Sequence, residues 1–554
     1  MIIESFQLQS GRSYGTISDP ISSTPVTLFV GPNNSGKSQI LKEIAQYCIN
    51  GKSDSLILKS IKFKEHNYEE ALRIINEIDI SETKNHTANG YIKYRVHNTS
   101  TQLPWSTMME ALQQSNTSES RFPSCYLANH TIILNGNNRI SLCDPQSGGN
   151  LLSNTRDSLP TLFKNDKKRE EVRRIIKEAF DSYFIIDPTD LGKLKIRLSE
   201  TAPKSPSFER SLDSDALEFQ QNARLIEEYS DGVKAFTGII TELVAGDPRV
   251  LLVDEPEAFL HPALAAKLGA EMSRSAANSK KNLFISTHSP AFVMGCIQSG
   301  TPVNIIRLTY RPNNATSRLL PSSEILELMR HPLLRSTGML SGLFYDYVIV
   351  TESDADRAFY QEINDRLLQF KPEWGINNCL FINAQNKQTA HTIVKPLRKL
   401  GIPTVAILDI DILKDGGQTW ANILKAAGIP HLSHNHLASA RQAIKTALDA
   451  TKKNMKTEGG INILDSQNRE SAMGLLDQLA QYGIFAVPFG ELESWLLEQN
   501  VSGHGPSWLV NMFEKLGHDS TSPNYVKPTD GDVWEFLGGV KAWLSNSSRR
   551  GIPS

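Results

Sequence analysis

Short apolar runs that end in a loop of glycine, asparagine, serine or an acidic residue recur along this chain. In the first half they occupy Val26–Val30, Arg249–Val253 and Asn282–Ser286, and their continuous hydrophobicity is typical of strands buried on both faces. Helical spacing of apolar residues predicts one helix from about Ser38 to Cys48 and another from Lys167 to Tyr183. A strand, a glycine-rich loop and a helix therefore follow one another near the N-terminus.

The second half of the chain alternates strand-like runs with helical segments. The strand-like runs are Tyr347–Thr351, Cys379–Ile382, Thr404–Leu408 and Ile484–Pro488. Strands separated by helices are typical of a parallel α/β sheet. The fold class predicted for the whole chain is therefore α/β.

Two domains are expected, and we place the boundary near Leu340. The first domain, 1–339, would contain the early strands and an inserted helical or dimerisation region somewhere within 51–225. The second, 340–554, would contain the parallel sheet. The chain has 554 residues, so each part is long enough to bury a core of its own.

The composition is that of an ordinary globular protein, with 40% hydrophobic and 21% charged residues. A net charge of −2 gives no general attraction to nucleic acid, although a local basic groove stays compatible with DNA binding. The five cysteines are scattered without a CxxC pair, which fits a reducing compartment and argues against a disulfide scaffold or a zinc ribbon. Neither a cationic leader nor an apolar run of about 18 residues is found, so we expect a cytoplasmic protein without a membrane span.

A phosphate-binding loop follows the first of the predicted strands. The segment matches the pattern G-x-x-x-x-G-K-[ST] between a strand and a helix, where backbone N–H groups and the helix N-terminus surround phosphates. Lys37 would reach the β- and γ-phosphates, and Ser38 would ligate Mg²⁺. The residues expected to bind ATP are Gly31, Asn33, Asn34, Ser35, Gly36, Lys37 and Ser38.

An acidic pair ends the strand Arg249–Val253. Asp254 is in the position of the Walker B aspartate, which holds Mg²⁺ directly or through water. Glu255 follows it and would activate the water that attacks the γ-phosphate. The first half therefore has the residues of an ATPase.

Acidic side chains also follow two strands in the second half. Glu352 comes directly after the first of them, and Asp356 would lie one turn into the next helix. Asp409 and Asp411 are two residues apart after a later strand, so continued strand geometry would project both to the same side. Carboxylate oxygens suit Mg²⁺ or Mn²⁺, and such metals activate water and stabilise the leaving oxygen of a phosphodiester. These four residues are candidate metal ligands and catalytic residues.

A third acidic pair, Glu491 and Glu493, follows the strand that ends at Pro488. Acidic residues near helix N-termini also serve simply as caps, and one cluster alone would leave both interpretations open. Three clusters, each after a strand, favour a metal site. The spacing leaves open which of Glu491 and Glu493 takes part.

Two further clusters have a less specific pattern. His431, His434 and His436 lack the cysteines or HExxH pattern of a zinc site, so a polar loop is predicted there. A basic stretch could contact a DNA backbone or be a solvated helix face, and both interpretations stay open. Its members are Lys445, Lys452, Lys453 and Lys456.

The run Asp254–Pro262 resembles the ABC-type ATPases of the SMC and RecF group. The resemblance implies that His288 is their switch histidine near the γ-phosphate, and that Tyr229–Val233 is their signature motif. It also implies that Ser230 and Gly232 cover the nucleotide of an opposite subunit, and hence a dimer of ATPase heads. The glutamine of the family's Q-loop is not placed.

A glutamate after one strand and the D-x-D of Asp409–Asp411 after a later one resemble a TOPRIM domain. With the ATPase motifs, nearly the whole chain resembles the OLD (overcoming lysogenization defect) nucleases, whose relatives include the Gabija nuclease subunit and retron-associated effectors. Two departures are Ser353, where the family has glycine, and Asn383–Lys387, which lacks the glycine of a Gly/Lys turn. The resemblance implies a second metal site completed by Glu491 or Glu493, and Lys541 as the basic residue that assists phosphate chemistry.

The leading hypothesis is therefore an ABC/SMC-like P-loop ATPase head followed by a TOPRIM domain that cuts DNA. Such an enzyme would use ATP and Mg²⁺ or Mn²⁺ and act in anti-phage defence. It would form a homodimer or homotetramer through its ATPase heads, with a reverse transcriptase and its DNA, or a helicase, as partner. The alternative is a DNA-repair ATPase clamp with a non-cleaving TOPRIM domain, which the lack of long coiled-coil arms disfavours. A topoisomerase would need an additional DNA-binding domain with a tyrosine nucleophile, and a primase would not need this ATPase.

Overall fold

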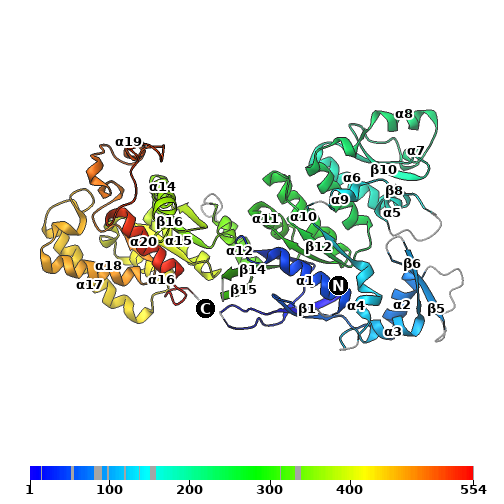
Figure 1. The fold of residues 1–554 in the computed structure, drawn as a ribbon, viewed down its shortest axis with the longest axis horizontal. Helices are drawn as coiled ribbons and strands as arrows, with labels where there is room; N and C mark the ends of the chain where they lie inside the picture. Colours follow the sequence, from blue (N-terminus) through cyan, green and yellow to red (C-terminus); the bar gives the residue numbers. More distant parts are fainter. Residues whose placement is uncertain are drawn as a thin grey trace. The chain divides into compact units, whose positions relative to one another are not determined.

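The computed structural model describes residues 1–13, 15–51, 55–79, 90–96, 99–117, 120–136, 138–149, 157–311, 314–330 and 338–552. Their contacts divide them into two compact units, Met1–Leu326 and Glu327–Ser554, whose elements are labelled in Figure 1. The units meet between Leu326 and Glu327, so the boundary predicted near Leu340 lies within the second unit. The predicted domain division remains a proposal.

A six-stranded sheet lies at the centre of the first unit, in the order β15-β14-β3-β13-β12-β7. Its strands are β15 (Asn314–Leu320), β14 (Val303–Arg311), β3 (Val26–Val30), β13 (Asn282–Ser286), β12 (Val250–Asp254) and β7 (Thr131–Leu134). All neighbours pair in parallel except β15, which is antiparallel to β14 at the edge. The predicted strands β3 and β13 are confirmed. The third predicted strand continues to Asp254, because that residue still pairs with Ser286.

Helices flank this sheet, and the first of them follows the phosphate-binding loop directly. They are α1 (Lys37–Asn50), α9 (Asp231–Ala245), α10 (Pro262–Asn278) and α11 (Pro290–Gln298), with α12 (Ser322–Arg330) after the β14–β15 hairpin. The predicted helix near Ser38–Cys48 is confirmed, with its apolar residues Ile40, Leu41 and Ile44 buried.

A smaller antiparallel sheet packs against the central one. It contains β1 (Ile3–Leu8), β2 (Ile21–Ser22) and β4 (Leu58–Phe63), in the order β2-β1-β4. Phe6 of β1 meets Phe284 of β13 with ring centroids 5.8 Å apart, and Phe284 stacks on Phe29 of β3 at 6.4 Å. These buried rings hold the two sheets together. They also fix the position of β3, the strand that leads into the phosphate-binding loop.

The region within 51–225 contains most of the remaining elements of this unit. They are α2 (Tyr68–Ile78), β5 (Tyr91–Val96), β6 (Thr99–Pro104), α3 (Trp105–Gln113), α4 (Phe122–Cys125), β8 (Gln146–Ser147), α5 (Ser158–Lys164), α6 (Asp166–Phe180), β9 (Tyr183–Asp187), β10 (Lys193–Ser199), α7 (Pro206–Glu209), α8 (Ser214–Asn222) and β11 (Arg224–Leu225). The helix predicted to reach Tyr183 ends at Phe180, because Asp181 adopts a left-handed conformation and Tyr183 begins β9. A role of this region in dimerisation remains a prediction.

The second unit contains a four-stranded sheet in the order β17-β16-β18-β19, with every neighbouring pair parallel. Its strands are β16 (Tyr347–Thr351), β17 (Cys379–Asn383), β18 (Thr404–Leu408) and β19 (Ile484–Ala486). The predicted parallel sheet is confirmed. The carboxyl ends of β16, β18 and β19 lie at one edge, because parallel strands end on the same side.

Helices connect these strands, and two more helices, α19 and α20, follow the last strand. They are α14 (Asp354–Phe370), α15 (Lys387–Lys399), α16 (Gly417–Ala426), α17 (His431–Ala450), α18 (Ser466–Ala480), α19 (Pro506–Leu516) and α20 (Asp532–Ser545). The polar loop predicted around His431, His434 and His436 is wrong: α17 begins at His431, after Pro430 at its N-cap. Pro430 lies before the first helical residue, so its missing N–H removes no hydrogen bond of the helix.

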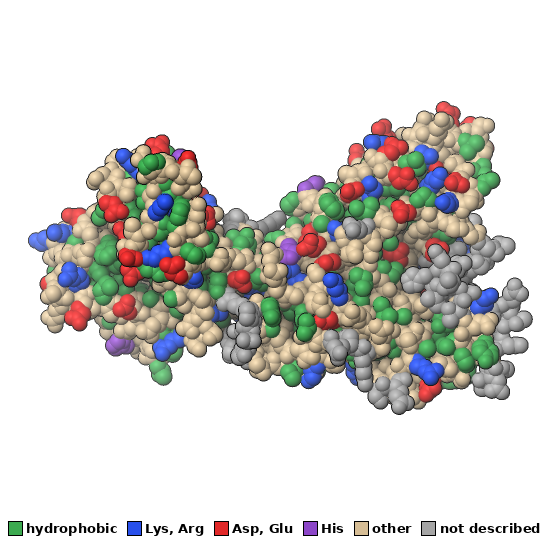
Figure 2. Space-filling model, in the orientation of Figure 1, with side chains coloured by type: hydrophobic (Ala, Val, Ile, Leu, Met, Phe, Trp, Pro, Cys, Tyr) green, Lys and Arg blue, Asp and Glu red, His purple; other side chains and the backbone are tan. Residues whose placement is uncertain are grey.

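None of the described helices is both long and apolar enough to cross a membrane. Figure 2 shows positive and negative side chains interspersed on the visible face of each unit.

Candidate nucleotide and metal sites

The phosphate-binding loop connects β3 to α1, as the sequence predicts. Gly31 has φ 145°, and a Cβ there would lie 2.1 Å from the Leu308 carbonyl oxygen, so only glycine fits. Gly36 at the N-cap of α1 has φ 92° and Asn34 has φ 60°. These turns direct the loop over the N-terminus of α1, where backbone N–H groups favour an anion.

Lys37 lies inside this loop. Its Nζ donates to the carbonyl oxygens of Gly31 at 2.9 Å and Pro32 at 2.6 Å. Burial lowers the pKa of Lys37 to about 8, despite the nearby charges of Glu255 and Asp254. The ammonium is therefore poorly hydrated, which favours an exchange of carbonyl oxygens for phosphate oxygens.

Asp254 and Glu255 take different environments at the end of β12. Asp254 Oδ1 accepts hydrogen bonds from Ser38 Oγ at 3.0 Å and from Ser286 Oγ. The predicted magnesium ligands Ser38 and Asp254 are thus in contact. Glu255 has φ 50°, and its half-exposed carboxylate lies 3.5 Å from His288 Nε2. Burial lowers the pKa of His288 below its usual value, which keeps this ring neutral near pH 7.

Arg139 stabilises this turn, although no sequence pattern pointed to it. Its buried guanidinium donates to the carbonyl oxygens of Asp254, at 3.3 Å, and Glu255. Glu257 stabilises the loop that follows β13. Its Oε1 accepts hydrogen bonds from Thr287 Oγ1 at 2.7 Å and from His288 N at 2.9 Å. The positions of Glu255 and His288 therefore depend on the buried Arg139 and the partly buried Glu257.

The candidate signature motif opens α9, as predicted. Ser230 is its exposed N-cap. Gly232 is buried against the segment after the Walker B pair, since a Cβ there would lie 2.7 Å from the Phe259 carbonyl oxygen. Glycine is therefore explained by packing at this position, while Ser230 stays available to a ligand.

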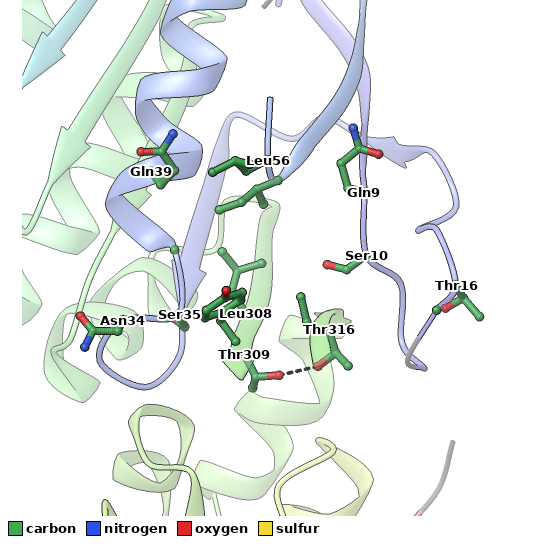
Figure 3. A pocket seen from close by; sticks show the side chains of 15 residues that line it. Gln9, Ser10, Thr16, Asn34, Ser35, Gln39, Leu56, Leu308, Thr309 and Thr316 are labelled. Carbon is green, nitrogen blue, oxygen red and sulfur yellow. Dashed lines mark hydrogen bonds between the residues drawn. The ribbon is translucent and has the colours of Figure 1, made fainter. Parts of the chain in front are cut away.

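A cavity of about 530 Å³ adjoins the phosphate-binding loop. Figure 3 shows Asn34 and Ser35 at one side, Gln9 and Ser10 at another, and the β14–β15 hairpin, joined by a Thr309–Thr316 hydrogen bond, below. Its size and largely apolar lining could hold the base and ribose of a nucleotide whose phosphates lie on the loop.

In the second unit, one group of carboxylates joins the ends of β16 and β18. Oxygen atoms of Glu352, Asp409 and Asp411 lie within 4.8 Å of one another. Glu352 Oε1 also accepts a hydrogen bond from Asp409 N at 2.9 Å. The strand geometry predicted for Asp409 and Asp411 is wrong, because β18 ends at Leu408 and a 3₁₀ turn, Ile410–Leu413, follows. The two carboxylates still meet, through the turn.

Asp356 has a different role in the described structure. Its Oδ2 accepts from Ser353 N at 2.8 Å, and Ser353 Oγ accepts from Asp356 N at 3.2 Å, which makes a reciprocal cap on α14. The serine that replaces the family's glycine thus begins the helix. Burial and the nearby Glu493 charge raise the pKa of Asp356. One of its oxygens is committed to this cap.

The close carboxylates are difficult to ionise together. Burial, and next the charge of Asp409, raises the pKa of Glu352 to about 8. Burial raises the pKa of Asp409 to about 6, against the opposing effect of Lys456. Asp411 Oδ1 is buried without a hydrogen-bond partner among the described residues. An oxygen-only group with such an unsatisfied atom fits Mg²⁺ or Mn²⁺.

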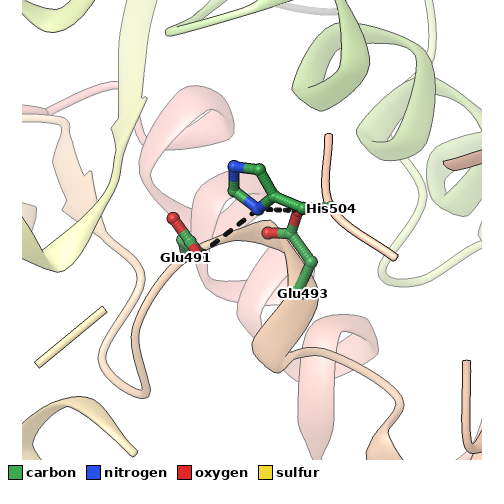
Figure 4. Close-up of side chains that lie close together, drawn as sticks. All are labelled: Glu491, Glu493 and His504. Carbon is green, nitrogen blue, oxygen red and sulfur yellow. Dashed lines mark ion pairs between the residues drawn. The ribbon is translucent and has the colours of Figure 1, made fainter. Parts of the chain in front are cut away.

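A second group lies after β19. Figure 4 shows His504 Nδ1 facing both Glu493 Oε1, at 2.8 Å, and Glu491 Oε1, at 3.7 Å. Gly505 N also donates to Glu493 Oε1 at 2.6 Å, which ties the His504 loop to the acidic loop. Ligand atoms of these three side chains lie within 4.8 Å. No sequence pattern pointed to His504, since it lies in a separate loop.

Two lysines contact these acids, and neither is the predicted one. Lys456 Nζ lies 2.8 Å from Asp409 Oδ2 and 3.1 Å from Glu491 Oε2, and Lys387 Nζ lies 2.8 Å from Asp411 Oδ2. Lys541 instead donates to the carbonyl oxygens of Pro372 and Glu373, just beyond the C-terminal end of α14. The acids lie near the opposite end of that helix, so the structure does not bring Lys541 to them.

The raised pKa values predict a pH-dependent effect of metal. The stability that a raised folded-state pKa contributes is complete below the unfolded value, near 4, and is lost as pH rises through about 6 for Asp409 and about 8 for Glu352. Without metal, the unfolding free energy should fall by about 2 kcal/mol between pH 6 and 8. Mg²⁺ should therefore raise the melting temperature more at pH 8 than at pH 6, measured by calorimetry. Glu352→Gln should reduce this difference, and an equal Mg²⁺ effect at both pH values would contradict the assignment.

Two family models match this chain. Residues 114–294 match "AAA domain, putative AbiEii toxin, Type IV TA system", and residues 343–411 match "Overcoming lysogenization defect protein-like, TOPRIM domain". The first range includes Asp254 and His288 but begins after the phosphate-binding loop, and the second includes Glu352, Asp409 and Asp411. No curated protein matches the chain.

Solved structures similar to the chain include SMC head domains. An SMC head bound to the C-winged helix domain of ScpA has 16% identity and a TM-score of 0.33, over 59% of this chain and 100% of that one. The SMC head domain from Thermotoga maritima has 12% identity and a TM-score of 0.28, over 58% and 100%. An SMC head from Pyrococcus furiosus has 14% identity and a TM-score of 0.31, over 59% of this chain and 98% of that one. At these scores the likeness is weak, and the family matches carry the assignment.

The first matched range contains Asp254, Glu255 and His288, and the second contains Glu352, Asp356, Asp409 and Asp411. The chain therefore contains an ATPase domain followed by a TOPRIM domain of the overcoming lysogenization defect (OLD) type.

Proposed function

We propose that this protein is an ATP-regulated, divalent-metal-dependent DNA endonuclease. The observation that carries the proposal is the meeting of carboxylates from the ends of β16 and β18, within 4.8 Å of one another, in a TOPRIM domain. The same chain contains an ATPase domain with an ordered Walker B pair. Burial and the nearby Asp409 charge raise the pKa of Glu352, so a divalent cation would favour its ionised form.

Glu352, Asp409 and Asp411 would hold one Mg²⁺ or Mn²⁺, and Glu491 and Glu493 would contribute to a second site. A divalent cation supplies the charge that activates water and stabilises the leaving oxygen of a phosphodiester. The protein's own part is to bring these oxygens together. Lys387 fixes one oxygen of Asp411, which leaves the other oxygen for a ligand.

In the ATPase domain, Ser38 and Asp254 would hold Mg²⁺ of the nucleotide. Glu255 is the proposed group that accepts a proton from the attacking water, because its carboxylate is half-exposed and faces His288. The exposed Ser230 supports a second proposal, that the heads form a homodimer or homotetramer in which this helix start covers the partner's nucleotide.

The family also supports a defence role in the cytoplasm, with a reverse transcriptase and its DNA, or a helicase, as partner. The described cysteines are unpaired, as expected in a reducing compartment.

The proposal is tested with supercoiled plasmid DNA, full-length protein, ATP, and Mg²⁺ or Mn²⁺. Nicked and linear DNA should appear when metal is present. EDTA should lower the cleavage rate by at least about 10³-fold, because the carboxylates alone repel a phosphodiester. ATP hydrolysis without metal-dependent cleavage would overturn the nuclease and support the non-cleaving clamp.

A further inference from the structure

The ammonium of Lys456 lies among carboxylates of both acidic groups. It is 2.8 Å from Asp409 Oδ2 and 3.7 Å from Asp411 Oδ2, in the first group. It is also 3.1 Å from Glu491 Oε2, in the second. One positive charge thus bridges the two groups of candidate metal ligands.

The backbone around Lys456 is fixed against the loop that carries Glu491. A Cβ on Gly490 would lie 2.1 Å from the Lys456 carbonyl oxygen, so this glycine permits close contact of the two segments. Ile461 N donates to the Pro488 carbonyl oxygen at 3.0 Å, and Ile410 N donates to that of Gly490 at 2.9 Å. The segments that carry the lysine and both acidic groups therefore pack together, and the ammonium is placed by this packing.

Lys387 provides a contrast within the same site. Its Nζ contacts Asp411 Oδ2 at 2.8 Å and Asp415 Oδ2 at 3.2 Å. Asp415 is not among the described groups that could hold a metal ion, and Asp411 Oδ1 stays unsatisfied. Lys387 can therefore remain in place when the site fills. Lys456 cannot, because it contacts two candidate ligands, Asp409 and Glu491, within 3.1 Å.

The same oxygen atoms cannot bind an ammonium and a divalent cation independently. A metal–oxygen distance of about 2.1 Å would place the two cations close together, where they repel. A metal that binds Asp409 must therefore push the Lys456 ammonium aside or bind more weakly.

We propose that Lys456 is an internal counter-cation that divalent metal must displace, so that it raises the metal concentration at which the nuclease site fills. Before metal binds, Lys456 holds the acidic loops together. The inference rests on the proposed metal-dependent nuclease and adds a regulating residue to its site.

The test is Mn²⁺ binding to the full-length protein without DNA or nucleotide, measured by calorimetry and by electron paramagnetic resonance of free Mn²⁺. All proteins carry Asp254→Asn, which removes the ATPase contribution. Lys456→Gln should bind Mn²⁺ about tenfold more tightly, because the competing charge is gone. Lys456→Arg, which keeps that charge, should bind no more tightly than the parent. Lys453→Gln, an exposed lysine of the same stretch, should leave the affinity unchanged.

Lys456→Met keeps much of the apolar stem and replaces Lys456→Gln if glutamine disturbs folding. Equal or weaker Mn²⁺ binding by the folded neutral variant would overturn the displacement model, while the proposed nuclease would stand. The proposed nuclease site itself fails if the parent binds no Mn²⁺, or if adding Asp409→Asn leaves its binding unchanged. The two results are therefore distinguishable.

Discussion

Glu255→Gln should lower the rate of ATP hydrolysis by about 10²–10⁴-fold while leaving ATP binding intact. Glutamine keeps the shape of the side chain but cannot accept a proton, and Glu255 is the half-exposed carboxylate beside His288. The groups expected to bind phosphate and magnesium, Lys37, Ser38 and Asp254, are unchanged. Phosphate release measures the rate, and a fluorescent ATP analogue measures binding.

Glu228→Gln is the matched control for this experiment, since Glu228 is an exposed glutamate of the same unit, paired with Arg224. It should hydrolyse ATP at the parent rate. If the heads pair through Ser230, Glu255→Gln should also accumulate as a larger species with ATP in analytical ultracentrifugation. Normal hydrolysis by Glu255→Gln would show that another residue activates the water.

Asp409→Asn should reduce metal-dependent DNA cleavage by about 10³-fold or more and leave ATP hydrolysis unchanged. The substitution keeps the side-chain volume, but a neutral amide is a poor ligand for Mg²⁺. It also removes the negative charge that raises the pKa of Glu352 and that pairs with the Lys456 ammonium. Nicking of supercoiled plasmid measures cleavage, and phosphate release measures the ATPase.

Asp354→Asn is the control, because Asp354 is an exposed acid of the same sheet edge, paired with Arg357. Its cleavage rate should match the parent. The assay extends to cells that carry the chain with its neighbouring genes: if the proposed defence role holds, the parent should protect against phage and Asp409→Asn should not. If both Asp409→Asn and Asp411→Asn cut as well as the parent, these carboxylates are not the nuclease site.

The ATPase site was largely predictable from the sequence. Its strand, glycine-rich loop and helix are consecutive, so local conformational preferences determine their geometry, as Gly31 and Gly36 illustrate. Arg139 was not predictable, because it reaches the Asp254 and Glu255 carbonyl oxygens from a distant segment. A single arginine in a polar loop forms no sequence pattern that predicts such a contact.

The acidic site was predictable only in part. Parallel strands end at one edge, so Glu352, Asp409 and Asp411 were expected to meet, and they do. The continued strand predicted to bring Asp409 and Asp411 to the same side was wrong, since a 3₁₀ turn places them. Asp356 was expected among the ligands, but one of its oxygens caps α14 through Ser353.

The sequence by itself determined the strands, the phosphate-binding loop and the acids at the strand ends, because apolar runs and glycine turns act over a few residues. Only the tertiary structure decided which charges meet. Lys456 belonged to a basic stretch that the sequence left open as a DNA contact or a solvated helix face, yet the close approach of Gly490 brings it to Asp409 and Glu491. Lys541 looked suitable but lies near the other end of α14. A buried charge is placed by the packing of segments distant in sequence, and no local pattern encodes that packing.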